Sequence, residues 1–502
     1  MTLVNQMCKH DNIIKKYNSF ESIPVPRLSM ARGQLHFLSS SEIQLIHDTS
    51  LRILDEVGIL VRSSSVTKML IEAGARRSKE DARLLISNDM VRAALLSAPK
   101  SILLASRNGK NDMRIPTDSS LFIANGGEGV YVKDMLTGAM RPSTLADVRD
   151  FAFLVDSLPQ IDFSWNMVGA LDQPAEMKGI AELIAGLENT NKHIQGGATT
   201  ASEAETTLKI LEAISGDLES FAKRPFFSSV QCPISPLSFE AGLAEAQVVL
   251  SKANVPIVAM VASVTGLTSP VTISGSLAQI NAENLASLVI SQTAQKGAPW
   301  IYSSDSAPGN LRTGSIDYGS IEGPLLRTGA GQMGRHYGLP VMCGGMSLEN
   351  TAPLLATASE GIPYFAIMAL IPTDLSSGFG GVDSAAGASF EMLLADAWVW
   401  DLAMEFIREF KVDEDSISFE TIREAALDKD FLGKRHTLSR FKEESAATRK
   451  PDAYFSEGPL KGKRNDLLRL AKKEVTKMLA MPRPSLLSRD EGSELERFAK
   501  AH

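Results

Sequence analysis

The sequence is poor in the side chains from which metal centres and disulfide frameworks are built. Its 502 residues include three cysteines, Cys8, Cys232 and Cys343, which lie far apart and form no Cys-x-x-Cys pair. This spacing excludes a zinc knuckle and a disulfide framework. So few cysteines are typical of a protein from a reducing compartment.

Long runs of basic or of apolar residues are also missing. The 51 Lys and Arg residues are dispersed and the formal net charge is −8, which argues against a broad phosphate-binding surface and therefore against nucleic acid as a partner. No apolar run approaches the roughly 20 residues of a membrane helix, and residues 1–17 lack the apolar core of a secretory signal. We expect a soluble cytoplasmic protein that does not bind membranes.

From Leu121 onward the sequence alternates short apolar segments with longer segments whose apolar residues recur at helical spacing. Eight strands, each followed by a helix, are the pattern of an α/β protein built as a TIM (β/α)8 barrel. The expected strands are Leu121–Asn125, Asp162–Met167, His193–Gln195, Phe226–Gln231, Ile257–Val261, Trp300–Ser303, Val341–Cys343 and Asp374–Ser377.

The regions on either side of this barrel are predicted to be helical. The expected divisions are an N-terminal arm (1–38), a helical N-terminal layer (39–115), the catalytic barrel (116–411) and a C-terminal helical extension (412–502). An amphipathic stretch in that extension, Asp466–Met481, is expected to pack on the barrel exterior. An open doubly wound sheet is the alternative for the central region, but the glycine-rich dinucleotide fingerprint does not follow the first strand.

Catalytic groups of a parallel barrel lie where strands end and loops begin. No histidine is predicted at these ends; His193 lies at the start of a strand and is expected to be structural. Without a cluster of His and Asp ligands, metal-assisted hydrolysis is disfavoured, and without a base near Cys232, nucleophilic catalysis is disfavoured too. The carboxylates at the strand ends are Glu128, Asp172, Asp305 and Asp383.

Glycines and aromatic residues gather at the same strand ends. Glycine lets a backbone come close to a large, flat partner, although ordinary turns are an equally good interpretation. Aromatic rings beside carboxylates can hold a quaternary ammonium through cation–π contacts, although each ring can instead pack in the core. The glycines are Gly126, Gly127, Gly344, Gly345, Gly380 and Gly381, and the aromatic residues are Tyr131, Trp165, Trp300, Tyr302, Tyr318 and Phe379.

Several longer motifs, spread over about residues 38–445, resemble the trimethylamine methyltransferase family. The most specific are PVTISG at 270–275, AQINAE at 278–283 and RTG at 312–314. Further matches are Thr137-Gly138 with Arg141-Pro142-Ser143-Thr144, Tyr337-Gly338-Leu339-Pro340, Asp383-Ser384, and Phe431-Leu432-Gly433 with His436-Thr437.

The resemblance implies a barrel that moves a methyl group from an amine to the Co(I) of a corrinoid. A separate small protein carries the corrinoid, so no cofactor is expected to bind this chain directly. Archaeal trimethylamine enzymes of the family carry pyrrolysine in the region after the match at 337–340. The corresponding turn here, Pro340–Asn350, contains only standard residues. The chain therefore resembles the branch without pyrrolysine, whose members use glycine betaine and other quaternary amines.

This resemblance gives the strand-end residues expected roles. A quaternary ammonium already carries its charge and leaves as a neutral amine, so no acid is needed and a site poor in ionisable groups suffices. Glu128 and Asp383 are expected to place negative charge near the ammonium, and Arg312 to pair with a betaine carboxylate. The six glycines are expected to face the corrinoid. Expected substrate contacts are Tyr302, Phe379, Tyr131, Arg312, Gln195 and Gln231.

Two other functions fit the same sequence. A catalytically silent betaine-binding or regulatory barrel would bind betaine without methyl transfer, and a barrel lyase would need an acid–base pair for which only carboxylates are at hand. The expected partners are a cognate corrinoid protein and a quaternary amine; a homo-oligomer is left open. A bulky residue in place of Gly345 is predicted to block turnover while the protein still folds.

Overall fold

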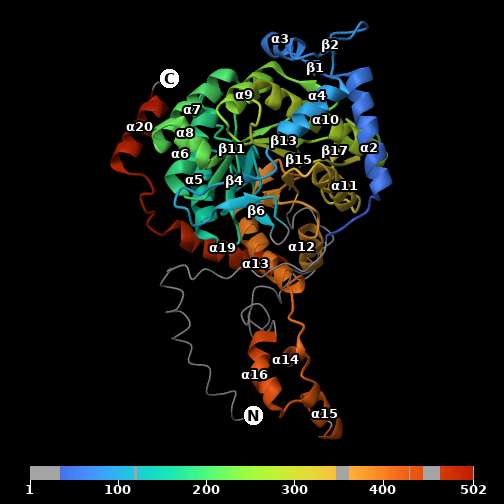
Figure 1. Cartoon of the computed structure of the whole chain (residues 1–502). Helices are drawn as coiled ribbons and strands as arrows, with labels where there is room; N and C mark the ends of the chain where they lie inside the picture. Colours follow the sequence, from blue (N-terminus) through green and yellow to red (C-terminus); the bar gives the residue numbers. More distant parts are fainter. Residues whose placement is uncertain (1–33, 118–120, 346–360, 429, 445–463, 501–502) are drawn as a thin grey trace.

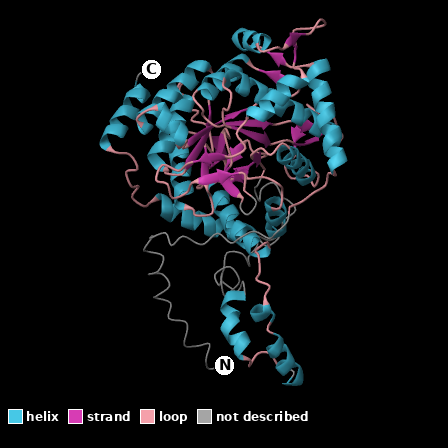
Figure 2. Cartoon of the chain, in the orientation of Figure 1, coloured by secondary structure: helices cyan, strands magenta, loops and turns pink. Residues whose placement is uncertain are grey.

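A closed barrel of eight parallel strands lies at the centre of the molecule (Figures 1 and 2). The computed structural model describes residues 34–117, 121–345, 361–428, 430–444 and 464–500. The strands follow one another around the barrel in chain order, and β19 closes it on β6. They are β6 (Phe122–Asn125), β9 (Phe163–Trp165), β10 (His193–Gly197), β11 (Phe227–Gln231), β13 (Ile257–Val261), β15 (Trp300–Ser304), β18 (Val341–Cys343) and β19 (Leu375–Phe379).

This closure confirms the predicted (β/α)8 barrel and excludes the open doubly wound sheet. Alternation along the strands explains it: in β13, Ile257, Ala259 and Val261 pack outward against the helices, whereas Val258 and Met260 fill the interior. The surrounding helices are α5 (Leu145–Ser157), α6 (Lys178–Asn189), α7 (Ala201–Ser215), α8 (Leu218–Lys223), α9 (Ala241–Lys252), α10 (Ile273–Ala294), α11 (Gly323–His336), α12 (Gly361–Ala369) and α13 (Phe390–Phe406).

The part of the predicted turn Pro340–Asn350 that follows Gly345 lies outside the described residues, because residues 346–360 are not described. Helix α12 is described from Gly361. The last barrel helix ends at Phe406, and the chain then leaves the barrel.

A hairpin closes the amino-terminal end of the barrel. It pairs β4 (Ile102–Leu104) with β5 (Met113–Ile115) in antiparallel fashion. Its apolar side chains join the interior cluster that also holds Phe122, Phe163 and Ile301. The two strands of this hairpin therefore form an apolar plug.

The N-terminal layer packs over α10. Its first helix begins with a capping box in which Ser39 and Glu42 satisfy each other's backbone N–H groups. The π-helical turn that follows ends at Gly58, whose φ of +75° and contact with the Leu84 carbonyl leave no room for a side chain. The elements are α2 (Ser40–Arg52), η1 (Ile53–Val57), β1 (Leu60–Val61), α3 (Ser64–Glu72), β2 (Arg76–Arg77), β3 (Leu84–Leu85) and α4 (Asn88–Ser97).

After α13 the chain forms a helical projection, residues 408–444, which we call the lobe. It contains α14 (Glu414–Ile417), α15 (Phe419–Asp428) and α16 (Arg435–Glu444) and extends away from the body of the protein (Figure 1). The chain then returns: α19 (Arg464–Leu479) buries Leu467, Ala471 and Val475 against the barrel exterior, and α20 (Arg489–Lys500) lies along α6 and α7. In the described part of the chain, no helix is both long and apolar enough to cross a membrane.

Short strands decorate the mouth, which is the carboxyl end of the barrel. A four-stranded sheet combines the loops that follow β6 and β19, and a second sheet combines the loops that follow β13 and β15. The first contains β7 (Tyr131–Lys133), β8 (Met140–Pro142), β20 (Gly381–Val382) and β21 (Gly387–Ala388); the second contains β14 (Val264–Thr265), β16 (Ala307–Asn310) and β17 (Ser315–Ile316). β12 (Ser238–Phe239) pairs with β1.

Candidate functional site

A cavity of about 480 Å³, a volume that includes solvent at its entrance, opens at the barrel mouth. Half of its lining residues are glycines, so backbone and a few large side chains form most of the wall. The lining residues come from the ends of β9 and β19 and from the loops after β6, β9, β15, β18 and β19. They are Gly126, Gly127, Trp165, Met167, Asp305, Tyr318, Gly345, Ser377, Gly378, Gly381, Ala385 and Gly387.

The charged group in this wall is Asp305, directly after β15. Its Oδ2 accepts a hydrogen bond of 2.9 Å from the Tyr318 hydroxyl. Burial raises the pKa of the Asp305 carboxyl, and the positive charge of Arg327 opposes that rise. Burial, followed by the Asp305 charge, raises the pKa of Tyr318 well above its ordinary value, so this phenol stays a hydrogen-bond donor. Together with Trp165, these residues form a wall of two aromatic rings and a carboxylate.

Arg327, from α11, lies behind that wall. It is fully buried, and its guanidinium carbon is 5.9 Å from the centre of the Tyr318 ring. Nε and Nη2 have no hydrogen-bond acceptor among the described residues, and the one contact of Nη1 is a weak one of 3.9 Å with the Met368 sulfur. A buried cation without an acceptor is costly. The sequence analysis missed Arg327, although a lone charge within the small and apolar run 323–334 is a usable signal.

The glycine pair after β18 is explained by these two charged side chains. A Cβ on Gly344 would overlap Asp305, and a Cβ on Gly345 would overlap the Arg327 guanidinium. Gly345 also has a φ of +91°, which L side chains rarely adopt. The proximity of protein neighbours therefore accounts for both glycines. A bulky residue at 345 would have to displace the Arg327 guanidinium and adopt a strained backbone conformation; the expectation that such a variant still folds and loses turnover stays a prediction.

Polar groups inside the barrel, beside the cavity, also lack partners. Trp165 and Gln195 are paired side by side on the neighbouring strands β9 and β10. The indole Nε1 and both amide atoms of Gln195 are buried without a hydrogen-bond partner among the described residues, as is the hydroxyl of Ser303 on β15. A polar ligand or ordered water beside them would relieve this cost. The predicted residue Gln195 thus faces the barrel interior; its contact with substrate stays a prediction.

Glu128 lies at the other side of the mouth, after β6. Solvent reaches the Glu128 side chain. Even so, the surrounding protein desolvates the carboxyl and raises its pKa. The positive charge of Lys178 opposes this rise, and the negative charge of Glu203 adds to it. The glycine opposite it, Gly197, would place a Cβ 3.1 Å from Glu128 Oε1. Nearby Glu182 is buried, accepts the Ala170 N–H at 2.8 Å, and has a pKa raised to about 7 by desolvation.

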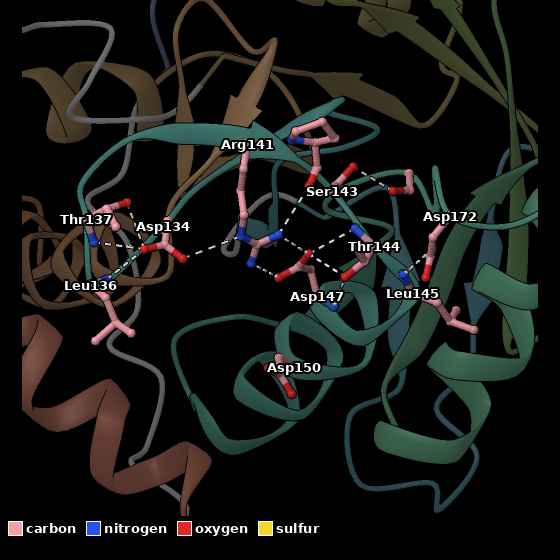
Figure 3. Close-up of polar contacts among 12 residues, drawn as sticks. Asp134, Leu136, Thr137, Arg141, Ser143, Thr144, Leu145, Asp147, Asp150 and Asp172 are labelled. Atoms are coloured by element: carbon pink, nitrogen blue, oxygen red, sulfur yellow. Dashed lines mark hydrogen bonds and ion pairs between the residues drawn. The ribbon is translucent and has the colours of Figure 1, made fainter.

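A polar network fixes the hairpin β7–β8 to α5 at this mouth (Figure 3). Arg141 donates to both carboxylate oxygens of Asp147 at 2.6 and 2.7 Å and lies 3.5 Å from Asp134. Asp134 accepts from Thr137 and from the Leu136 N–H. The Thr-Gly and Arg-Pro-Ser-Thr motifs at 137–144 are thus explained by positioning of the mouth sheet.

Two predicted substrate contacts point away from the cavity. Tyr302 is fully buried on the outer face of β15, and its hydroxyl lies 3.3 Å from Asn281 on α10. Phe379 packs between the barrel and the helices, against Phe365 and Trp400. Both predictions assigned the wrong face of a strand, and the aromatic residues that line the cavity are Trp165 and Tyr318.

Four further predicted residues do not line the cavity. Tyr131 is exposed on β7, and Arg312 lies exposed at the tip of the β16–β17 hairpin. Gln231 is buried and donates to the Ala198 carbonyl and the Ser229 hydroxyl. Asp383 is exposed at the tip of the β20–β21 hairpin, with a φ of +52°. The structure therefore brings Asp305 to the cavity in place of Asp383, and Arg327 next to it in place of Arg312.

The predicted glycines divide into two groups. Gly126, Gly127, Gly345 and Gly381 line the cavity. Gly380 is buried, and a Cβ there would lie 3.1 Å from Leu393; Gly344 is buried against Asp305. Whether any of them faces a corrinoid stays a prediction.

The thiols and the barrel histidine carry no nucleophile. Burial raises the pKa of Cys232 and of Cys343 to about 12, so both thiols stay protonated. Burial lowers the pKa of His193 to about 4, and its Nε2 is 2.9 Å from the Ser228 hydroxyl. Within the described residues, no group of three or more His, Cys, Asp or Glu side chains is arranged to hold a metal ion.

Comparisons with known proteins agree over most of the chain. Trimethylamine methyltransferase MttB of Desulfitobacterium hafniense (strain DSM 10664 / DCB-2) is 26% identical over 407 residues, which cover 81% of this chain and 82% of the relative. Glycine betaine methyltransferase of D. hafniense (strain Y51) is 27% identical over 425 residues, covering 82% and 86%. Trimethylamine methyltransferase MttB of Methanosarcina barkeri is 25% identical over 408 residues, covering 80% and 82%.

Among solved structures, the monomethylamine methyltransferase MtmB of M. barkeri matches with a TM-score of 0.44 and 10% identity, covering 91% of this chain and 92% of that one. The family model described as trimethylamine methyltransferase (MTTB) matches residues 10–502. This chain is a member of the trimethylamine methyltransferase family.

Proposed function

We propose that this chain transfers a methyl group from a quaternary amine to the Co(I) of a corrinoid protein. The observation that carries the proposal is the cavity wall at the barrel mouth, where the Asp305 carboxyl lies with the rings of Trp165 and Tyr318. Carboxylates and aromatic faces attract a quaternary ammonium, which has no N–H and therefore cannot donate a conventional hydrogen bond. Family membership supplies the reaction class.

The chemistry fits a site without a strong acid or nucleophile. When the methyl carbon passes to the acceptor, the C–N bond breaks and its electron pair stays on nitrogen, which gives a neutral tertiary amine. No proton has to move. The role left to the protein is to orient the methyl group toward the mouth and to exclude water. The glycine-rich walls and the packed barrel interior suit that role.

The pair of Asp305 and Arg327 favours a betaine among quaternary amines. One buried carboxyl and one buried guanidinium balance a substrate that carries both an ammonium and a carboxylate. A substrate with an ammonium alone, such as choline, leaves Arg327 without an acceptor. In this assignment Trp165, Tyr318 and Asp305 attract the ammonium, and Arg327 attracts the carboxylate across the Gly345 turn. Glycine betaine is the smallest substrate of this kind.

The test is transfer to a reduced corrinoid protein, followed by the loss of Co(I) absorbance, with a panel of glycine betaine, longer betaines, choline, tetramethylammonium and trimethylamine. Transfer from a betaine with formation of the demethylated amine supports the proposal. Transfer from trimethylamine and from no quaternary amine contradicts it. Calorimetric binding of a betaine with no transfer to any corrinoid protein assigns the chain to a silent binding protein instead.

A further inference from the structure

Among the described residues, four large side chains line the cavity at the barrel mouth, and three of them are fixed by close neighbours. The Trp165 ring packs against Gly127, where an added Cβ would overlap the indole. Asp305 and Tyr318 hold each other through their hydrogen bond of 2.9 Å. The fourth is Met167, whose thioether has several rotatable bonds and no strong hydrogen-bonding group. Met167 is therefore the member of this set that packing holds in place.

Met167 follows β9, and its side chain lies between two loops of the mouth. Its backbone is fixed, because its carbonyl accepts the Gly129 N–H at 3.1 Å. Its sulfur accepts a weak contact of 3.5 Å from Asn125 Nδ2. Its methyl carbon lies between the loops that follow β6 and β19: an added Cβ would be 3.3 Å from it on Gly126 and 3.2 Å from it on Gly380. The end of the thioether therefore fills the space that these two glycines leave open.

An apolar, polarisable group at this position suits the methyl groups of a quaternary ammonium. The carboxylate and the aromatic faces attract the positive charge, but Coulomb attraction falls slowly with distance and discriminates poorly between head groups of different size. Close packing discriminates well, since one methylene more or less in a hydrophobic pocket changes kcat/KM by about 10- to 200-fold. Because Met167 is buried, a larger group on nitrogen has to displace it against packed neighbours.

We propose that Met167 determines which alkyl groups the substrate nitrogen can carry, so that N-methyl groups are accepted and longer N-alkyl groups are excluded. This role rests on the proposed function, since it requires an ammonium held beside Asp305. One side of the ammonium then faces the carboxyl and the two rings, and its other side faces the thioether and the glycine backbone. An N-ethyl group needs the space that the Met167 methyl carbon occupies between Gly126 and Gly380.

The test compares methyl transfer from glycine betaine with transfer from the analogue in which one N-methyl group is replaced by N-ethyl. The wild type is expected to favour glycine betaine in kcat/KM by about tenfold or more. In Met167→Ala this preference should fall by about tenfold, mainly because kcat/KM for the ethyl analogue rises. If another betaine is the better substrate of the wild type, the same replacement is made on that betaine.

Two further variants separate a role in selection from a role in folding. Met167→Leu conserves volume and should keep the preference within roughly threefold of the wild type. Met478→Ala truncates a buried methionine of α19, on the barrel exterior, and should keep the wild-type preference. An unchanged preference in Met167→Ala, an equal loss of kcat/KM for both substrates, or the same change in Met478→Ala overturns the proposal. If Met167→Ala does not fold, Met167→Val, a smaller truncation, is judged by the same outcomes.

A binding measurement separates the role of Met167 from the proposed reaction. Calorimetric titration with tetramethylammonium and with tetraethylammonium needs no methyl acceptor. The wild type is expected to bind tetramethylammonium about tenfold more tightly or better, and Met167→Ala should bring the two dissociation constants close together. A wild type that binds neither ion and transfers no methyl group from any quaternary amine contradicts the proposed function itself. A wild type that binds both ions equally, or a Met167→Ala variant that keeps the wild-type ratio, overturns the role of Met167 alone.

Discussion

The barrel mouth and the lobe are both incomplete, in opposite ways. At the mouth, polar atoms of Arg327, Gln195 and Trp165 are buried without partners among the described residues. In the lobe, apolar side chains such as Leu427 and Leu432 are exposed without cover. The first region has the character of a binding site, and the second that of an exposed apolar surface. Substitutions at the mouth should therefore change turnover and leave the fold of the lobe intact.

The largest expected effect at the mouth comes from Asp305→Asn. Loss of the negative charge beside the aromatic wall should lower kcat/KM for methyl transfer by about 100-fold or more, as removal of a preorganised electrostatic group does. The matched control is Asp383→Asn on the exposed hairpin, expected to change kcat/KM less than threefold. Equal losses in the two variants would contradict the assignment of Asp305, and circular dichroism should show the same fold for both.

Arg327→Met tests the buried cation. Loss of a charge-assisted contact of about 1.5–3 kcal/mol should lower kcat/KM for a betaine roughly 10- to 100-fold, while any slow transfer from choline should change little. Because an unpaired buried charge is removed, the melting temperature should stay equal or rise. Arg312→Met, at an exposed hairpin tip, serves as the control. An equal loss of kcat/KM with betaines and with choline would show that Arg327 does not select for the carboxylate of the substrate.

Two tyrosines separate the inner and outer faces of the barrel wall. Tyr318→Phe deletes the hydrogen bond to Asp305, worth about 1.5 kcal/mol, and should lower kcat/KM roughly tenfold. Tyr302→Phe deletes a long hydrogen bond to Asn281 behind the barrel and should leave kcat/KM within twofold. Both variants are compared in the same methyl-transfer assay, with circular dichroism as a control for folding. A larger loss of kcat/KM for Tyr302→Phe than for Tyr318→Phe would contradict the assignment of Tyr318, and not Tyr302, to the site.

The last expected effect concerns stability and not turnover, at the Glu128 side of the mouth. The pKa of Glu182 is raised from 4.5 to about 7, so between these values the folded state holds more protons than the unfolded state. The contribution of Glu182 to the free energy of unfolding therefore falls as pH rises through this window. The total fall, from below the window to above it, is at most about 3 kcal/mol. Relative to the wild type, Glu182→Gln should gain a few °C in melting temperature between pH 5 and pH 8. A pH-independent difference would contradict this.

The sequence predicted the barrel well because each strand is a short apolar segment bounded by glycine, proline or polar residues. All eight predicted strands overlap strands of the closed barrel. The predicted site was less accurate because a strand end gives the position of a residue but not the face on which its side chain lies. A shift of one residue, from Ser303 to Tyr302, exchanges the interior for the helix layer.

Long-range neighbours account for the remaining differences. Arg327 lies in a helix 22 residues after Asp305 in the sequence, and only the folded chain brings it against Gly345 and Tyr318. The glycine pair 344–345 was interpreted as facing a flat partner or as an ordinary turn, because its neighbours Asp305 and Arg327 could not be identified from local sequence. Likewise, Asp383 and Arg312 lie exposed on hairpins that pair with neighbouring loops of the mouth, and this long-range pairing could not be predicted from local sequence.

The apolar plug made by β4 and β5 has a kinetic consequence. Because it fills the amino-terminal end of the barrel together with Phe122 and Phe163, molecules reach and leave the cavity through the mouth. In the proposed reaction, an acceptor protein seated on that mouth would close the route, so the amine would have to bind before the acceptor and the demethylated amine would have to depart after it. Steady-state kinetics should then follow a compulsory-order sequential scheme, in which the demethylated product competes with the amine for the free enzyme.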